Sequence, residues 1–167
     1  MLEKTVKNKR WETFFIGVAE LSAKMSYCKR LQVGAVLVGD KRILANTWNG
    51  TVSGKSNNCE DTTYRCNACD CDITTNTCNT CGAEGVGYIK TNPFTIHAEQ
   101  NLIANCAKNG IKMSGCDVYV THSPCKECSK LLAQSGIDTV YYKNEYKDTS
   151  GLTFLVEAGV KVKKINT

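Results

Sequence analysis

The sequence predicts a three-layer α/β domain, in which one mixed five-stranded sheet lies between helices. From about residue 95 to the end, segments with helical periodicity alternate with short apolar segments, which is typical of parallel strands joined by helical crossovers. Near residues 33–45, two apolar segments flank Gly39-Asp40-Lys41, a typical hairpin turn. A length of 167 residues is ordinary for one domain, so we expect residues 1–167 to form a single domain.

Two regular structures are expected in the first third of the chain. Residues from about Arg10 to Met25 carry apolar side chains at three- and four-residue spacing, which predicts a helix. The segments Val33–Val38 and Arg42–Ala45 predict the strands of a hairpin, and the first, apolar on both faces, should lie inside the sheet. The side chains of the helix expected to face the core are Phe14, Phe15, Val18, Leu21 and Met25.

After Pro93 the pattern becomes regular again. A helix is expected at Ala98–Lys108, and Gly110 should end it. The later crossovers are long enough for helices, so the last three strands should run parallel. The expected elements are strands Val118–Thr121, Thr139–Tyr142 and Val160–Lys164, with helices at Cys125–Gln134 and near Leu152–Ala158.

Two short motifs carry the chemistry. His97-Ala98-Glu99 lies at the start of one expected helix, and Pro124-Cys125-Lys126-Glu127-Cys128 at the start of another. One nitrogen and two sulfurs, from His97, Cys125 and Cys128, suit a tetrahedral zinc with a fourth position free for water. Helix starts favour thiolates, because their N–H groups and partial positive charge stabilise anions. The pattern matches the known signature of zinc-dependent nucleobase deaminases.

Glu99 is the candidate catalytic residue. On a helix, a residue two positions past His97 does not point at the same ion, but it can lie beside a water on that ion and transfer protons. The alternative is a closed structural zinc with a fourth ligand such as Cys106 or Cys116, although core positions suit these two cysteines better. His122 is interpreted as a cleft or surface residue, with contact to a ligand as the alternative.

Residues 51–92 depart from the regular pattern. They are rich in small polar residues, and six cysteines lie between positions 59 and 81. Two Cys-x-x-Cys pairs, separated by eight residues, resemble those of structural zinc modules, and metal bonds could order a segment with so little apolar material. Free thiols or a redox pair are the alternative. The candidate ligands of this second zinc are Cys28, Cys59, Cys66, Cys69, Cys78 and Cys81, with Cys71 also within the segment.

Composition and charge narrow the class of protein. Hydrophobic residues make up 42% and charged residues 22%, as in soluble globular proteins. No apolar run approaches the ~18 residues that span a bilayer, and the first residues lack the apolar block of a signal peptide, so we expect a cytoplasmic protein without membrane contact. The formal net charge of +5 would fall to about +3 with zinc bound to four thiolates. Such a mild positive field suits a phosphorylated substrate, and no nucleic-acid partner is expected.

The segment Thr47-Trp48-Asn49-Gly50 follows the expected hairpin. Asn-Gly is first of all a turn signal. An aromatic ring and an amide at a strand end could also face a nucleotide, and the two interpretations are compatible.

Taken together, the chain resembles the deoxycytidylate (dCMP) deaminase family of the cytidine-deaminase-like superfamily. The likeness covers most of the chain. Its blocks are Leu21-Ser22-Ala23, Gln32-Val33-Gly34-Ala35, Trp48-Asn49-Gly50, His97-Ala98-Glu99, Pro124-Cys125-x-x-Cys128 and Ala133-Gln134-Ser135-Gly136-Ile137.

The resemblance implies hydrolysis of dCMP to dUMP and ammonia, with Glu99 as proton shuttle. It also implies regulation by dCTP with magnesium and by dTTP, and a homo-oligomer, often a hexamer. Nucleotide binding is implied for Trp48, Asn49, Gly50 and Ala98, and a second zinc in some members for cysteines placed like Cys28 and Cys59. No motif identifies the phosphate site, for which Lys24, Ser26, Lys29 and Arg30 are candidates.

Two other functions remain open at this level. A tRNA adenosine deaminase shares both zinc motifs, although the cysteine-rich insertion and the modest charge argue against it. A catalytically silent zinc module would not need the intact Glu99.

Overall fold

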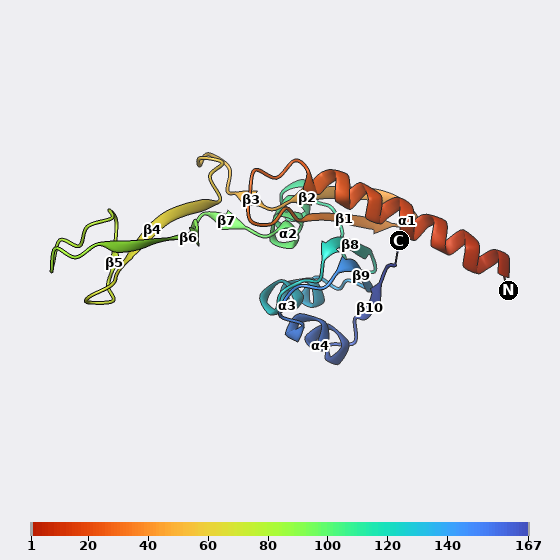
Figure 1. Cartoon of the computed structure of the whole chain (residues 1–167). Helices are drawn as coiled ribbons and strands as arrows, with labels where there is room; N and C mark the ends of the chain where they lie inside the picture. Colours follow the sequence, from red (N-terminus) through yellow and green to blue (C-terminus); the bar gives the residue numbers. More distant parts are fainter. Residues whose placement is uncertain (1, 167) are drawn as a thin grey trace.

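A computed structural model describes residues 2–166, with side chains from residue 9 onward. The body of the protein is built on a five-stranded sheet with the order β10-β9-β8-β1-β2 (Figure 1). Strands β8, β9 and β10 run parallel to one another, and β1 runs antiparallel to β2 and β8. The predicted mixed five-stranded sheet is therefore confirmed. The strands are β1 Gly34–Gly39, β2 Arg42–Trp48, β8 Asp117–His122, β9 Thr139–Asn144 and β10 Lys161–Lys164.

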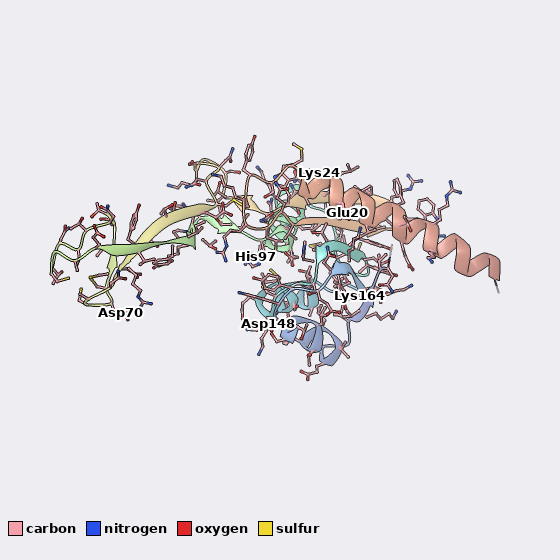
Figure 2. The ribbon with its side chains drawn as sticks, viewed as in Figure 1. Glu20, Lys24, Asp70, His97, Asp148 and Lys164 are labelled. Carbon is pink, nitrogen blue, oxygen red and sulfur yellow. A yellow bond between two sulfur atoms is a disulfide. The ribbon has the colours of Figure 1, made fainter. Side chains whose placement is uncertain are left out.

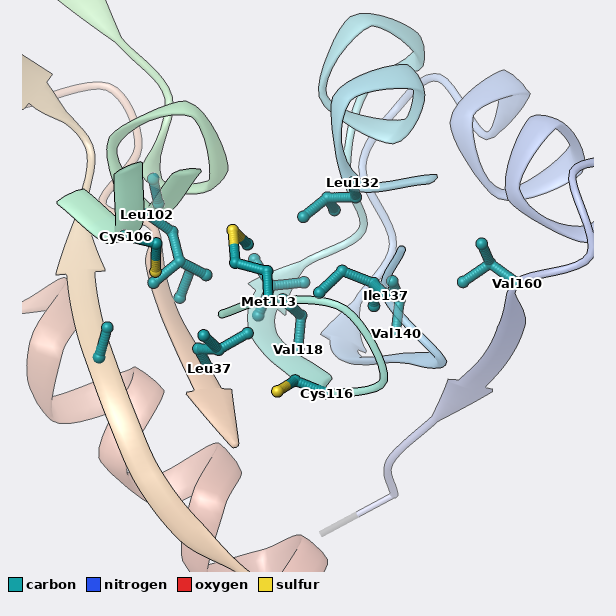
Figure 3. Packing of buried hydrophobic residues seen from close by; sticks show 14 of the residues in the cluster. Leu37, Leu102, Cys106, Met113, Cys116, Val118, Leu132, Ile137, Val140 and Val160 are labelled. Carbon is teal, nitrogen blue, oxygen red and sulfur yellow. The ribbon is translucent and has the colours of Figure 1, made fainter. Parts of the chain in front are cut away.

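Helices cover both faces of this sheet because β1 is apolar on both sides. Val36 and Val38 pack in one hydrophobic cluster with α1, while Ala35 and Leu37 pack in another with Leu102 of α2. Figure 3 shows the second cluster, into which Leu37, Leu102, Val118 and Leu132 point from separate elements. The helices are α1 Leu2–Ala23, α2 Ala98–Asn109, α3 Lys126–Gln134 and α4 Ser150–Glu157.

The predicted core face of α1 was right for Phe15, which is buried, and for Val18, which packs against the core, but wrong for the other three residues. Phe14, Leu21 and Met25 have exposed fractions of 52%, 63% and 57%, and the helix ends at Ala23, before Met25. Ile16 and Ala19, which the periodicity did not indicate, are buried beside Phe15 against the sheet. Glycine is required at position 34 because α1 crosses β1 so closely that a Cβ atom there would lie 2.0 Å from the Ala19 carbonyl oxygen.

The cysteine-rich segment folds into strands rather than remaining irregular. Residues 59–91, named the arm here, form a three-stranded antiparallel sheet, β5-β4-β6, which projects away from the body (Figure 1). At its root, β3 Gly50–Thr51 pairs with β7 Thr95–Ile96, which leads directly into His97. The strands of the arm are β4 Glu60–Cys66, β5 Asp72–Ile73 and β6 Gly85–Thr91.

In the described part of the chain, no helix is both long enough and apolar enough to cross a bilayer.

Candidate active site

A cavity of about 330 Å³ lies where the root of the arm joins the body. Its walls come from the 28–33 loop, the arm root, the start of α2, the end of β8 and the segment after β9. His97, Glu99 and Cys125 line it, and Figure 2 shows His97 at this junction, far from Asp70 near the end of the arm. Segments that are distant in sequence therefore enclose the predicted chemical groups.

Two helix starts bring the three predicted metal ligands together. His97 precedes the first residue of α2, and its backbone N–H donates to Oε1 of Gln100 at 2.9 Å. Cys125 precedes α3 in the same way, and Cys128 follows within its first turn. Nδ1 of His97 lies 3.6 Å from Sγ of Cys125 and 3.4 Å from Sγ of Cys128.

The donor set fits a zinc ion that keeps an open position. The three ligand atoms lie within 4.8 Å of one another, and no fourth His, Cys, Asp or Glu joins this group among the described residues. Hydrogen bonds from Cys128 and from His97 lower the pKa of the Cys125 thiol to about 3, whereas the hydrogen bond with Cys125 and burial raise the pKa of Cys128. One of the two thiolates that a zinc requires is therefore favoured before a metal binds. Cys106 and Cys116 are buried in the hydrophobic core instead (Figure 3), as expected for cysteines that are not ligands.

Glu99 lies beside this group and is almost completely buried, with an exposed fraction of 4%. Burial raises the pKa of its carboxyl group, because a charge loses its hydration there. A carboxyl group with a raised pKa at the edge of a cavity is suited to accepting and returning a proton near neutral pH.

Comparison with known proteins agrees with this geometry. Residues 9–144 match the family described as "Cytidine and deoxycytidylate deaminase zinc-binding region". The deoxycytidylate deaminase of Mycobacterium phage D29 is 32% identical over 81% of this chain and 95% of its own. The chain belongs to the deoxycytidylate deaminase family.

Two further relatives are similar over nearly the whole chain. ComE operon protein 2 of Bacillus subtilis is 37% identical over 93% of this chain and 71% of its own. The crystal structure of the dCMP deaminase from cyanophage S-TIM5, in complex with dCMP and dUMP, superimposes with a TM-score of 0.72 at 38% identity. That alignment covers 92% of this chain and 95% of the phage enzyme, so the two proteins share the fold over most of their length.

In this member of the deoxycytidylate deaminase family, the four predicted nucleotide-binding residues divide into two pairs. Asn49 and Ala98 line the cavity, whereas Trp48 and Gly50 are not among its lining residues. Successive side chains along an extended segment point to opposite sides, so the side chains of Trp48 and Asn49 do not face the same ligand, and Gly50 has no side chain. Asn49 also accepts a hydrogen bond from the Val33 N–H and donates one to the Leu31 carbonyl, each at 2.8 Å, which holds the 31–33 loop at the cavity wall.

Two cationic side chains line the same cavity. Arg30 does so, but the other phosphate candidates, Lys24, Ser26 and Lys29, do not. Lys147 was missed by the sequence reasoning, together with Tyr146 beside it. Both follow β9, and the carboxyl ends of parallel strands commonly carry ligand-binding residues, which is the signal that could have found them.

His122 also lines the cavity, consistent with its interpretation as a cleft residue. Burial lowers the pKa of its imidazole. A neutral ring at this position can donate or accept a hydrogen bond without adding charge.

The arm brings together four of the six candidate ligands of the second zinc. The sulfurs of Cys66, Cys69, Cys78 and Cys81 lie within 4.8 Å of one another. The backbone N–H of Ala68 also points at Sγ of Cys66, at 3.4 Å, an arrangement that stabilises a thiolate.

Cys28 and Cys59 do not join the other four, which corrects their assignment as ligands. Their sulfurs form a disulfide that joins the loop after α1 to the root of the arm. The carboxylate of the adjacent Glu60 accepts hydrogen bonds from the backbone N–H groups of Lys29 and Arg30. This pair therefore positions the loop that carries Arg30 instead of completing a metal site in the arm.

Proposed function

We propose that this protein is a zinc-dependent hydrolase that converts dCMP and water to dUMP and ammonia. One observation carries the proposal: the buried carboxyl group of Glu99 lies beside three side chains that can bind a metal. Arg30 and Lys147 line the same cavity. The deoxycytidylate deaminases among its relatives support this substrate.

His97, Cys125 and Cys128 are the residues that would hold the zinc. When bound, zinc lowers the pKa of a water to near 7, which makes hydroxide available at neutral pH. Glu99 would take one proton from the attacking water and pass it to the ring nitrogen. It would then take the second proton from the hydroxyl group newly bonded to the ring carbon and pass it to the amino group, which leaves as ammonia when its bond to the ring carbon breaks. The burial of Glu99 keeps solvent from exchanging the proton during transfer.

The two cations make a nucleotide a better substrate than a nucleoside. A guanidinium binds phosphate through two parallel hydrogen bonds, whereas an ammonium acts as a point charge, so Arg30 and Lys147 together suit a 5′-phosphate. The backbone N–H groups of Lys29 and Arg30 donate hydrogen bonds to the Glu60 carboxylate, and the Arg30 guanidinium donates one to the Thr91 hydroxyl. These bonds tie this loop to the arm root.

The arm is proposed to hold the second, structural zinc through Cys66, Cys69, Cys78 and Cys81. Little apolar material is buried in the arm, so four metal–sulfur bonds are the main source of its stability. The acidic balance of the arm disfavours a role in binding tRNA, because residues 59–91 contain five Asp or Glu side chains and only two Lys or Arg.

Regulation by dCTP with magnesium, inhibition by dTTP, and assembly into a homo-oligomer such as a hexamer complete the proposal. Family resemblance supports them. Exposed apolar side chains along and after α1, namely Phe14, Leu21, Met25 and Tyr27, also support association between copies. Light scattering with and without dCTP or dTTP would measure both the assembly and its response.

The assignment is tested by ammonia release from dCMP, deoxycytidine, dCTP and a tRNA anticodon stem. Turnover of dCMP at far lower concentration than deoxycytidine is expected. Turnover of the tRNA stem alone would identify an adenosine deaminase. No turnover by zinc-loaded protein on any of the four would identify a silent zinc module.

A further inference from the structure

A fifth cysteine lies against the four-thiol group of the arm. Sγ of Cys71 is 3.1 Å from Sγ of Cys69 and 3.7 Å from Sγ of Cys78. A tetrahedral zinc uses only four of these five sulfurs. Cys71 therefore has no place in the set of four ligands, although it is within contact distance of two of them.

The arm site has an internal repeat that shows what is unusual about Cys71. Cys66-Asn67-Ala68-Cys69-Asp70 and Cys78-Asn79-Thr80-Cys81-Gly82 form two turns of the same design. In both turns the fifth residue has a left-handed backbone conformation, with φ of +53° at Asp70 and +71° at Gly82. In both, its N–H donates to the carbonyl of the first cysteine, at 3.1 and 2.8 Å.

The repeat extends one residue further. The N–H of Cys66 donates to the carbonyl of Cys71, and the N–H of Cys78 donates to that of Ala83, both at 2.9 Å. Ala83 is thus the counterpart of Cys71, and the turn needs no sulfur at this position. Because the extra thiol is present in just one of the two turns, the two halves of the site differ chemically.

The exposure of the five thiols indicates which ligand can be replaced. Cys66 and Cys78, the first cysteine of each turn, are buried, whereas Cys69 and Cys81 are exposed and Cys71 is partly exposed. Replacement of a ligand is therefore easiest at the two exposed cysteines, Cys69 and Cys81, and Cys71 lies next to Cys69.

We propose that Cys71 is an exchangeable fifth ligand of this metal site, able to replace Cys69 as a thiolate on a thiophilic divalent ion. The exchange breaks one metal–sulfur bond and forms another, and the proton of the Cys71 thiol passes to the released Cys69. The arm would then keep its metal when Cys69 is blocked, for example by an alkylating or oxidising compound. This inference rests on the proposed zinc site of the arm.

The internal repeat provides a matched pair of variants in the full-length protein. Cys69→Ser removes a ligand that has a spare thiol beside it, and Cys81→Ser removes its counterpart, which has Ala83 instead. Zinc per chain would be measured by atomic emission for wild type, both variants, Cys71→Ala and the double variant Cys69→Ser/Cys71→Ser. We expect about two zinc ions for wild type, Cys71→Ala and Cys69→Ser, and about one for Cys81→Ser and the double variant.

Cobalt substitution gives a second measurement. The sulfur-to-cobalt absorption of Cys69→Ser should match that of wild type, because four thiolates still bind. A loss of the arm metal in Cys69→Ser, or its retention in the double variant or in Cys81→Ser, would overturn the exchange. A single zinc in wild type would instead overturn the arm site itself, so the two failures are distinguishable.

Discussion

Gly151 in α4 lies against the loop that carries Cys125, a proposed metal ligand. A Cβ atom at residue 151 would come within 2.1 Å of the Pro124 carbonyl oxygen and 2.9 Å of the Cys125 carbonyl carbon. The helix after β9 thus supports the turn in which Cys125 is held, and this contact tolerates no side chain.

Replacing Gly151 with alanine should therefore displace the Pro124–Cys125 backbone. We expect the free energy of unfolding to fall by about 1–3 kcal/mol, as for overpacked sites. We also expect less zinc to bind at the site formed by His97, Cys125 and Cys128. Thermal unfolding and metal analysis would measure the two effects.

Gly17→Ala is the matched control, because Gly17 is also helical and nothing lies within 4 Å of its Cβ position. That variant should gain up to about 1 kcal/mol from helix propensity. Equal behaviour of the two variants would contradict the proposed contact.

Glu99→Gln should retain zinc but lose turnover. The amide keeps the shape of the side chain but cannot take up a proton, so kcat for dCMP should fall by roughly 10²- to 10⁴-fold. Steady-state kinetics together with zinc analysis would check this. Glu127→Gln is the control, since Glu127 is exposed on α3 and, within the described part of the chain, forms an ion pair with Lys130 alone. Normal turnover by Glu99→Gln would show that another group moves the proton.

Arg30→Gln should impair the nucleotide but not the nucleoside. Loss of a charge-assisted hydrogen bond costs about 1.5–3 kcal/mol, so kcat/KM for dCMP should fall roughly ten- to hundred-fold. The value for deoxycytidine should not change. Lys29→Gln, at a neighbouring lysine that does not line the cavity, should leave both values close to wild type. A loss of the same size on both substrates would place Arg30 elsewhere in the mechanism.

Breaking the link between Cys28 and Cys59 should destabilise the protein. The bond closes a loop with a sequence separation of 31 residues, and a loop of this size is worth about 3–4 kcal/mol. Cys28→Ala/Cys59→Ala should therefore unfold at a lower temperature than wild type. A thiol reductant should lower the transition of wild type but not that of the variant, and peptide mapping without reductant should recover the linked pair. Identical transitions for all samples would exclude the bond.

Several features could be predicted from short stretches of sequence. The hairpin turn at Asp40-Lys41, the end of α2 at Gly110, and the parallel order of β8, β9 and β10 depend on local geometry and connection length. The motif around His97 was informative for the same reason, because its residues are separated by fixed steps at the start of a helix.

Other features depended on contacts between distant segments. The buried face of α1 is decided by its close crossing over Gly34, which periodicity does not reveal, since a neighbouring face is apolar too. Tyr146 and Lys147 enter the cavity only because β9 lies beside β8 in the sheet.

The order of residue types along the chain was thus enough to identify the family, the α/β architecture and the residues suited to the chemistry, since helix starts and ligand spacings are local properties. Which cysteines meet, which cations line the cavity and which helix supports Cys125 were decided by tertiary packing. Sulfur–sulfur bonds and metal sites require atoms within a few ångströms, and the folded backbone brings distant residues to that range.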